Sequence, residues 1–508
     1  MTTTERSADH VDVLIVGAGL SGIGAGYHFQ AECPQKTYAI LEARESIGGT
    51  WDLFRYPGVR SDSDMYTLGY RFRPWPDAKA IADGPAILQY VRDTAGEHGI
   101  DRKIRFGHRV VRAEWSTESA RWTVEAERSD TGQTVRLTCG FLLLCTGYYR
   151  YDRGYSPEFE GRERFRGPIV HPQHWPEDID YADKRVVVIG SGATAVTLVP
   201  AMAESAAHVT MLQRSPSYIV ALPAEDPVAR VLRRLPARLA YAVLRWKNVL
   251  LMLLSFQLSR RRPELVKKLI RKGVERRLPA GYPIDTHFKP PYNPWDQRMC
   301  LVPDSDLFEA ISAGRASVVT DRIATLTEDG IELGSGDRLE ADLIVTATGL
   351  NLHPLGGMTL AVDGENVALP ERMAYKGTML GGVPNFAMAL GYTNASWTLK
   401  CDLTCEYVCR LLNHMDERGY RQCMPVNDPS VAPEPIIDFN SGYILRSIKK
   451  FPKQGSRRPW RLYQNYALDI FTLRYGNVDN GALRFSPSPS APRTRVTSAT
   501  SAATRPAG

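Results

Sequence analysis

Two stretches of the chain place short apolar runs, glycine turns and amphipathic segments in the same order. Residues 11–42 give a strand (VDVLIV), a glycine turn, a helix and a second strand (YAILEA). Residues 185–214 repeat this scheme from RVVVIG to HVTMLQR. Continuous apolar runs bounded by turns are typical of strands buried in a parallel sheet. The two βαβ units therefore predict an α/β fold with two Rossmann-like dinucleotide-binding domains.

The division of the chain into domains follows from two further strands. FLLLCTG at 141–147 and LIVTATG at 343–349 each end in a small-residue turn, and we expect the chain to cross between domains near both. The C-terminal segment has almost no large apolar residues, so we expect it to be disordered. The predicted parts are a first nucleotide-binding domain (11–147 and 350–485), a second one with its linker (148–219 and 301–349), a helical insertion (220–300) and a disordered tail (486–508).

Positive charge is concentrated in one segment of the predicted insertion. The net charge is +7, but residues 230–277 hold 15 Lys and Arg against Glu264 and Glu275, a local balance of +13. The same segment contains RLAYAVLRWKNVLLMLLSFQL, which has no strand alternation and favours helices. Two interpretations stay open: amphipathic helices that attract an anionic membrane surface without spanning it, or an apolar face that covers a ligand pocket. Nothing in the segment resembles a nucleic-acid-binding module.

The N-terminus and the cysteines indicate a cytoplasmic protein, with membrane association as an open addition. The first ten residues are polar, and the first apolar run ends in a glycine motif instead of a cleavage site. We expect no stretch of transmembrane length. Eight cysteines are too few for a disulfide scaffold of 508 residues.

Three cysteines share one predicted helical face. Cys401, Cys405 and Cys409 lie four residues apart. Zinc binding is the alternative, but no histidine or fourth cysteine stands at finger spacing. The pattern favours a buried apolar stripe, and we predict no metal site.

The first glycine turn carries the spacing of a phosphate cradle. Gly17, Gly19 and Gly22 follow a strand and open a helix, where backbone N–H groups attract a pyrophosphate. Glu42 ends the second strand, 20 residues after Gly22. A carboxylate there accepts hydrogen bonds from ribose hydroxyls and repels a 2′-phosphate. This turn predicts an adenosine with a free ribose, as in FAD or NAD.

The second glycine turn predicts a different nucleotide. Its second strand ends in Arg214 and Ser215 instead of an acid. An arginine there suits a 2′-phosphate and favours NADPH, whereas the alternative is a solvated surface arginine. One cradle of each kind predicts FAD plus NADPH, and flavin supplies chemistry that side chains lack. The residues of this cradle are Gly190, Ser191, Gly192, Ala193, Thr194 and Ala195.

The region after the first βαβ unit separates two classes of flavoprotein. A flavoprotein disulfide reductase needs two closely spaced cysteines there, and residues 43–110 contain none. The segment reads GGTWDLFRYPGVRSDSDMYTLGYRFRP instead.

Several motifs together resemble type I Baeyer–Villiger monooxygenases. FRGPIVHPQHWP spaces Phe165, Gly167, His171 and Trp175 as in that family's fingerprint, although Pro172 stands where many members have threonine. YNPWDQRMCLVP and GYTNASWTLK extend the similarity. The resemblance implies that NADPH and O₂ convert ketones to esters through a C4a-peroxyflavin, with oxidation of sulfides and thioamides. The alternatives are a flavin monooxygenase that mainly oxidises sulfur or nitrogen, and a membrane-docking flavoprotein that uses residues 230–277.

The resemblance also implies roles for individual residues. Arg298 would be the catalytic cation that stabilises anionic oxygen, and Asp62 would position it. His171 would hydrogen-bond backbone at a hinge and Trp175 would pack between domains, or both would pack in a rigid loop. The residues expected to contact FAD are Gly17, Gly19, Ser21 and Gly22 at the pyrophosphate, Glu42 at the ribose, Thr50, Trp51, Asp52, Arg60, Ser61 and Asp62 around the flavin, and Val110 near the adenine.

Overall fold

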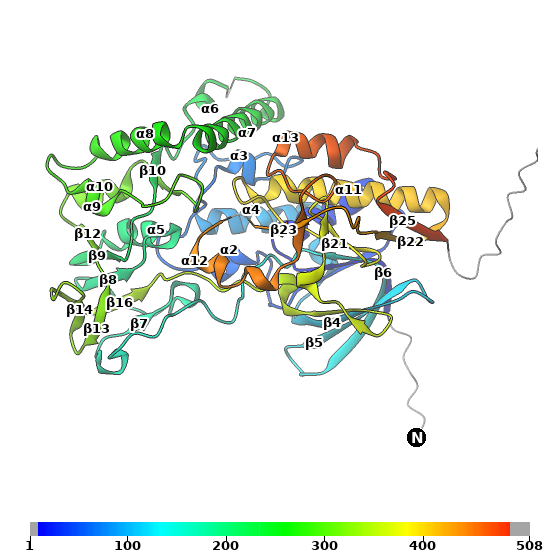
Figure 1. Cartoon of the computed structure of the whole chain (residues 1–508), viewed down its shortest axis with the longest axis horizontal. Helices are drawn as coiled ribbons and strands as arrows, with labels where there is room; N and C mark the ends of the chain where they lie inside the picture. Colours follow the sequence, from blue (N-terminus) through cyan, green and yellow to red (C-terminus); the bar gives the residue numbers. More distant parts are fainter. Residues whose placement is uncertain (1–8, 233, 438, 488–508) are drawn as a thin grey trace, which may run out of the picture.

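Two βαβ units organise the molecule, as the sequence predicts (Figure 1). The computed structural model describes residues 9–232, 234–437 and 439–487. In both units the strands are buried apolar runs and a glycine turn opens the helix. The first unit is β1 (Asp9–Val16), α1 (Leu20–Glu32) and β2 (Tyr38–Leu41); the second is β8 (Arg185–Ile189), α5 (Ala193–Met202) and β9 (His208–Gln213).

The first domain is built on a mixed sheet, with strand order β18-β17-β4-β5-β6-β1-β2-β3 and β21 beside β6. β1 lies parallel to both β2 and β6, whereas β4, β5 and β6 form an antiparallel meander. The C-terminal part of the chain returns to this sheet, because β17 and β21 pair with β4 and β6. The bounds are β3 (Ile104–Arg105), β4 (His108–Ser116), β5 (Arg121–Arg128), β6 (Thr134–Leu144), β17 (Thr359–Val362), β18 (Glu365–Asn366) and β21 (Phe386–Met388).

The second domain has a five-stranded sheet of order β12-β9-β8-β16-β7, and all of its pairs are parallel. Its central strands β8 and β16 are buried on both faces, as their continuous Val and Ile runs predict. The two sheets confirm the predicted α/β fold with two Rossmann-like domains. The remaining strands are β7 (Ile169–Val170), β12 (Ala316–Thr320) and β16 (Leu343–Thr346), with the meander β13 (Ile323–Thr327), β14 (Gly330–Leu333) and β15 (Arg338–Glu340) beside them.

Helix α11 (Trp397–Arg418) packs along α1 in the core of the first domain. Cys401, Cys405 and Cys409 are buried on it. The predicted apolar stripe is therefore confirmed. Shorter elements around this core are α2 (Thr50–Leu53), α3 (Met65–Leu68), α4 (Gly84–Glu97), η1 (Asp101–Lys103), α12 (Gly442–Leu445), α13 (Tyr466–Asp469) and η7 (Ile470–Tyr475).

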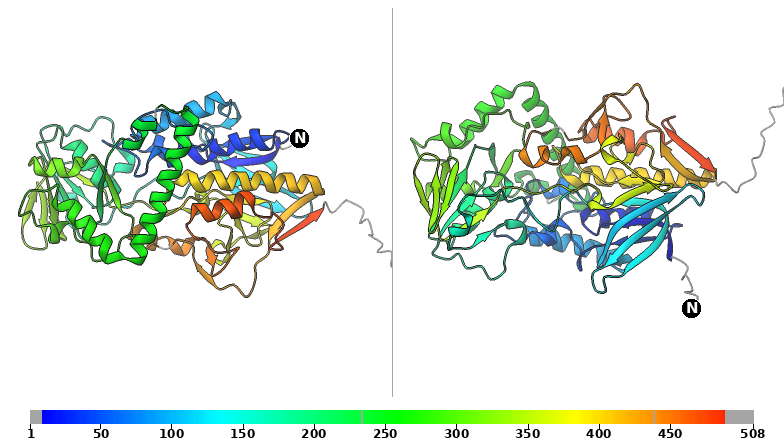
Figure 2. Two further views of the ribbon diagram at one scale, coloured as in Figure 1. Left: turned by 90° about the horizontal axis from the view of Figure 1, so that it is seen from above. Right: turned by 60° about the horizontal axis from the view of Figure 1, so that its bottom comes forward.

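The predicted helical insertion consists mainly of α6 (Pro227–Leu232), α7 (Ala237–Arg261) and α8 (Pro263–Glu275). Short strands flank it, β10 (Ile219–Leu222) and β11 (Cys300–Pro303), which pair in parallel beside the second domain. Seen from above, α7 runs across the junction of the two domains (Figure 2). The expectation that no segment reaches transmembrane length is wrong. α7 is long and apolar enough by length and composition, and only 22% of its most apolar window is buried.

The end of the described chain corrects one predicted boundary. β25 (Leu483–Pro487) pairs antiparallel with β22 (Tyr420–Pro425). Residues 486–487 thus belong to a strand, because their backbone groups complete a ladder. The rest of the predicted tail, 488–508, lies outside the described residues.

A buried ionic cluster joins α1, α11 and the insertion. His28 Nδ1 lies 2.8 Å from Glu32 Oε1, and His28 Nε2 lies 3.5 Å from Asp402 Oδ1. Arg245 on α7 approaches the same Asp402 carboxylate at 3.7 Å. Burial alone would lower the pKa of His28, but the two carboxylates outweigh it and raise that pKa to about 9. His28 is therefore charged at neutral pH.

The cluster predicts a loss of stability at alkaline pH. The pKa of His28 is higher in the folded chain than its ordinary 6.5, so its contribution is complete below pH 6.5 and disappears as pH rises through about 9. This contribution is on the order of 3 kcal/mol. Urea unfolding should be measured at pH 6 and at pH 9.5. The free energy of unfolding of the wild type should exceed that of His28→Gln at pH 6 and approach it at pH 9.5. The control, His174→Gln, changes an exposed histidine. An equal difference in unfolding free energy between wild type and His28→Gln at both pH values would mean that His28 is not stabilised as a charged group.

Candidate functional site

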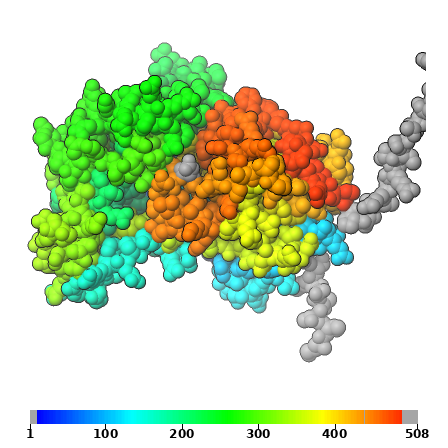
Figure 3. Space-filling view, in the orientation of Figure 1, coloured from blue at the N-terminus to red at the C-terminus, as the bar shows by residue number. Residues whose placement is uncertain are grey.

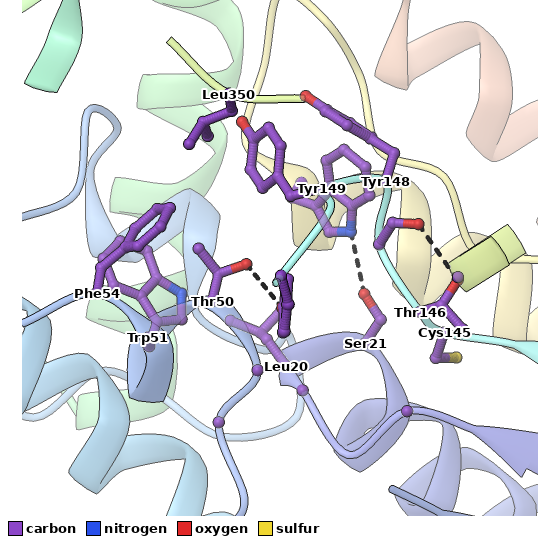
Figure 4. Close-up of a pocket in the computed structure, with 18 of the residues that line it drawn as sticks. Leu20, Ser21, Thr50, Trp51, Phe54, Cys145, Thr146, Tyr148, Tyr149 and Leu350 are labelled. Atoms are coloured by element: carbon purple, nitrogen blue, oxygen red, sulfur yellow. Dashed lines mark hydrogen bonds between the residues drawn. The ribbon is translucent and has the colours of Figure 1, made fainter. Parts of the chain in front are cut away.

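A cavity of about 710 Å³ lies where the two domains meet. Its walls come from both domains: the β1–α1 turn, the end of β2, the segment from Gly48 to Ser63, the turn after β6, the start of α5, and Arg298. Figure 4 shows the part near Leu20, Thr50, Tyr149 and Leu350. Such a junction of two Rossmann-like domains can hold two nucleotides next to each other.

The first glycine turn is shaped to receive a pyrophosphate. Gly17 has a φ of +103°, and a Cβ there would lie 2.6 Å from the Cys145 carbonyl oxygen. A Cβ on Gly22 would lie 1.9 Å from the Gly17 carbonyl oxygen, so this glycine lets the helix approach the strand. Gly19 caps α1 without a side-chain hydrogen bond, and it lines the cavity with Ser21. The free N–H groups of the first helical turn suit a phosphate anion.

Glu42 stands at the cavity wall, at the end of β2. Its Oε2 accepts a hydrogen bond from the Ala18 N–H at 2.6 Å, and its Oε1 accepts one from the Arg44 N–H at 2.9 Å. Burial raises the pKa of Glu42. The two backbone bonds fix the carboxylate and leave lone pairs for ribose hydroxyls, so the geometry suits its predicted role.

Most of the other residues expected at the flavin line the same cavity. Ser61 and Val110 do so directly. Thr50 Oγ1 lies 3.2 Å from the Tyr151 hydroxyl, and a dashed line starts at Thr50 in Figure 4. Trp51 stands beside Thr50 in that view.

Asp52 and Arg60 are held by ion pairs instead. Asp52 does not line the cavity and pairs with Arg44 at 2.5 Å and Arg92 at 3.2 Å, and its assignment as a cofactor contact stays a prediction. Arg60 lines the cavity, but its guanidinium pairs with Asp306 on α10 (Asp306–Ser312) of the second domain. Its charge thus ties the two domains together.

Asp62 and Arg298 form a two-pronged ion pair inside the cavity. Arg298 Nε lies 2.8 Å from Asp62 Oδ2, and its terminal nitrogen donates to Asp62 Oδ1 at 2.9 Å. The neighbouring Asp62 carboxylate raises the pKa of Arg298 even further above its usual range. About a third of each side chain stays exposed, at 34% and 32%. The pair therefore presents a permanent, oriented cation to the cavity.

A group of aromatic residues in the wall was not predicted from the sequence. The Tyr148 ring lies 4.7 Å from Tyr149 and 5.0 Å from Trp397. Trp397 Nε1 donates to Ser21 Oγ at 3.0 Å (Figure 4). Burial raises the pKa of both tyrosines, so they stay protonated. The available signal was the run YYRY directly after the small-residue turn of β6.

The second glycine turn repeats the architecture of the first. Gly190 has a φ of +139°, and a Cβ there would lie 2.3 Å from the Ala347 carbonyl oxygen. Gly192 caps α5 without a side-chain bond. Ala193 and Thr194 line the cavity, whereas Gly190, Ser191, Gly192 and the buried Ala195 lie outside its wall.

Arg214 and Ser215 stand at the exposed end of β9, beyond the cavity wall. The Ser215 carbonyl oxygen accepts a hydrogen bond from Ser191 Oγ at 3.1 Å, so the end of β9 lies next to the glycine turn. Within the described parts of the chain Arg214 has no ion pair. Its charge is therefore free to bind a phosphate group.

His171 connects the linker to the turn after β16. Its Nδ1 accepts the Gln173 N–H at 3.1 Å, so the proton resides on Nε2, which donates to the Gly349 carbonyl oxygen at 3.1 Å. Burial lowers the pKa of His171, consistent with a neutral ring. The backbone hydrogen bond expected for it is thus present. Trp175 packs against the hydrophobic core of the second domain, and Tyr56 from the first domain belongs to the same core.

Comparisons with known proteins agree with this geometry. The model of the flavin-binding monooxygenase-like family matches residues 74–353. The chain is 57% identical over 484 residues to the FAD-containing monooxygenase EthA of Mycobacterium tuberculosis (strain ATCC 25618 / H37Rv), covering 95% of this chain and 99% of the relative. It is 54% identical over 481 residues to the protein of that name from Mycolicibacterium smegmatis, covering 94% and 97%.

A solved structure shows the same fold. An oxidized steroid monooxygenase bound to NADP superimposes with a TM-score of 0.75 at 22% identity, covering 94% of this chain and all of that one. The chain belongs to the flavin-binding monooxygenase-like family and is a flavin-dependent monooxygenase. The resemblance inferred from its motifs is confirmed.

Arg214 carries a prediction about nucleotide choice. Arg214→Ala removes a cation expected at the 2′-phosphate, and a charge-assisted contact contributes roughly 1.5–3 kcal/mol. Steady-state oxidation of NADPH should show a KM raised about 10- to 150-fold, whereas the KM for NADH changes little. Arg166→Ala, another exposed arginine of the second domain, is the matched control. Equal changes for both nucleotides would rule out the assignment.

Proposed function

We propose that this chain is an FAD- and NADPH-dependent monooxygenase that inserts one oxygen atom from O₂ into ketones to give esters. We also propose that it oxidises sulfides and thioamides. The observation that carries the ketone reaction is the Arg298–Asp62 pair, a permanent cation facing the cavity that the first glycine turn also lines.

The two cradles support the assignment of the cofactors. The first combines free helix N–H groups with the fixed Glu42 carboxylate, where the second has Arg214, and this suits FAD. The second ends in the unpaired Arg214, which suits NADPH. The relatives of this chain that are named FAD-containing monooxygenases support the FAD assignment, and the similar solved structure bound to NADP supports the NADPH assignment. FAD, when bound, would supply the hydride and oxygen chemistry.

Arg298 would act on the substrate oxygen. When a nucleophilic oxygen adds to a ketone, the carbonyl oxygen becomes an oxyanion, and a cation placed beforehand stabilises that charge. A guanidinium cannot readily release its proton, so it stabilises the anion without neutralising it. Asp62 binds two nitrogens of the guanidinium, Nε and one terminal nitrogen, and this limits the orientations of Arg298.

The aromatic wall would control access of water and substrate. Tyr148, Tyr149 and Trp397 pack ring against ring at the cavity. Their apolar faces favour an apolar substrate and exclude water from the reacting centre. Their size and arrangement, together with Leu350, would select among ketones.

Oxidation of sulfur or nitrogen is the second candidate, and it differs in one physical respect. A sulfide that accepts an oxygen atom forms no tetrahedral oxyanion on carbon. Oxidation of a sulfide therefore depends less on charge stabilisation by Arg298 than oxidation of a ketone does. Removing the guanidinium separates the two reactions in one protein.

We predict that Arg298→Ala lowers the rate of ester formation about 100- to 1,000-fold and the rate of sulfoxide formation much less. NADPH oxidation should continue, with hydrogen peroxide released in place of ester. Mass spectrometry of products from a ketone and a thioether, with peroxide measured alongside, tests this. Arg298→Lys keeps the charge without the planar fork and should recover only part.

The matched control is Arg136→Ala, which removes an exposed cation of the first domain that pairs with Glu125 and does not line the cavity. It should keep both activities. Ester formation by Arg298→Ala at the wild-type rate would place the catalytic cation elsewhere. Equal losses of ester and sulfoxide would mean that Arg298 acts before the two reactions diverge.

A further inference from the structure

The outer face of α7 is apolar and exposed to solvent. Its members repeat every three or four residues, so they form one stripe along the helix. Their exposed fractions range from 40% to 65%, which is unusual for large apolar side chains in a folded protein. The residues are Leu239, Val243, Trp246, Leu250, Leu251, Leu254 and Leu258.

The neighbouring helices extend this apolar surface. Val231 on α6 is 73% exposed, and Leu265 and Leu269 on α8 are 47% and 56% exposed. α6, α7 and α8 form the upper edge of the molecule in Figure 1, and the same green segment lies along the upper edge of the space-filling view in Figure 3. We name this surface, the outer face of α6, α7 and α8, the helical edge.

The opposite face of α7 is fixed to the protein. The Tyr241 hydroxyl donates to the Tyr70 carbonyl oxygen at 2.9 Å, and Arg245 donates to the Tyr66 and Gly69 carbonyl oxygens at 2.8 Å each. Phe256 packs against Trp295 at a ring distance of 5.6 Å. A membrane-spanning position would break these contacts and strip Arg245 of its partners. The helix can thus contact a membrane along its side but cannot cross it in this fold.

Unpaired cations surround the apolar stripe. Within the described residues, eight Lys and Arg side chains between 227 and 277 form no ion pair with Asp or Glu. They stand before the apolar stretch, after it and along α8, whereas residues 246–259 contain one charged side chain, Lys247, which pairs with Asp226. The eight are Arg234, Arg238, Arg261, Arg262, Lys268, Lys272, Arg276 and Arg277.

This arrangement selects the kind of partner. An apolar stripe with cations at both ends matches the boundary between acyl chains and anionic headgroups. A second copy of the chain docked on the same face would bring two sets of unpaired cations together, which is unfavourable. The face also cannot serve as the inner lid of the cavity, because no residue of 220–297 lines that cavity. The interpretation that the apolar face covers the substrate pocket is therefore wrong for this cavity.

We propose that the helical edge docks the enzyme onto an anionic lipid bilayer, with α7 lying in the plane of the membrane surface. The exposed leucines enter the boundary of the acyl chains while the flanking cations bind lipid phosphates. Because α7 is already held by its inner face, docking requires no rearrangement of the fold. The proposal concerns binding alone and holds whichever substrate the cavity accepts.

Vesicle co-sedimentation of the full-length, FAD-loaded protein tests the proposal. Vesicles of equal parts phosphatidylglycerol and phosphatidylcholine should bind the protein at low salt, at least ~10-fold more tightly than phosphatidylcholine alone. Added salt should weaken the binding. Two variants, Leu250→Gln/Leu254→Gln/Leu258→Gln and Lys268→Glu/Lys272→Glu, should each lower the affinity for the anionic vesicles about 10-fold. Glutamine is a good helix former, so the first variant should keep α7 intact.

The control is Arg102→Glu/Lys103→Glu, which reverses two exposed, unpaired cations on η1, outside the helical edge. It should bind vesicles like the wild type. NADPH oxidation without vesicles should be equal in all variants and shows that they fold. No binding to anionic vesicles at low salt would overturn the proposal. A dimer in analytical ultracentrifugation that the leucine variant dissociates, without vesicle binding, would instead identify the face as an interface between copies.

Discussion

The ion pair between Arg298 and Asp62 is the interaction on which the site depends. Its two residues are 236 positions apart, one after α2 in the first domain and the other directly before β11. They meet only when both domains are folded and docked. The nitrogen–oxygen distances of 2.8 and 2.9 Å leave the guanidinium little freedom. The pair is thus both the proposed source of catalytic charge and a consequence of how the domains sit together.

Other contacts maintain the same docking. Arg60 from the first domain pairs with Asp306 of the second, and His171 binds the Gly349 carbonyl oxygen at the crossover between domains. α7 lies across the junction on the outside. These contacts hold the phosphate cradles on either side of one cavity. Two nucleotides bound there would face each other without a large movement of the domains.

The sequence predicts well whatever depends on local spacing. The glycine turns, the opposite charges at the ends of β2 and β9, and the helical insertion follow from residues within about thirty positions of one another. Each is governed by backbone geometry or by the local period of apolar residues. For the same reason the buried cysteine stripe on α11 was predictable.

Contacts between distant segments could not be predicted. Asp52 sits in a motif that suggests a cofactor contact, but the motif does not show that its carboxylate also forms ion pairs with Arg44 and Arg92. The role of Trp397 depends on its reaching Ser21 across 376 positions. Composition predicted helices for 220–300, but it did not show that α7 has one buried apolar face and one exposed. That division depends on which side meets α3.

The proposed reaction transfers one oxygen atom from O₂ to a ketone. Isotope labelling tests it most directly. The purified enzyme, with FAD and NADPH, would receive a simple ketone under ¹⁸O₂, and in a parallel reaction under ¹⁶O₂ in H₂¹⁸O. Under ¹⁸O₂ the ester should carry one ¹⁸O atom. In H₂¹⁸O under ¹⁶O₂ it should carry no ¹⁸O other than that introduced by exchange of the ketone oxygen with water. An unlabelled ester under ¹⁸O₂, or oxidation of NADPH without any ester, would contradict this reaction.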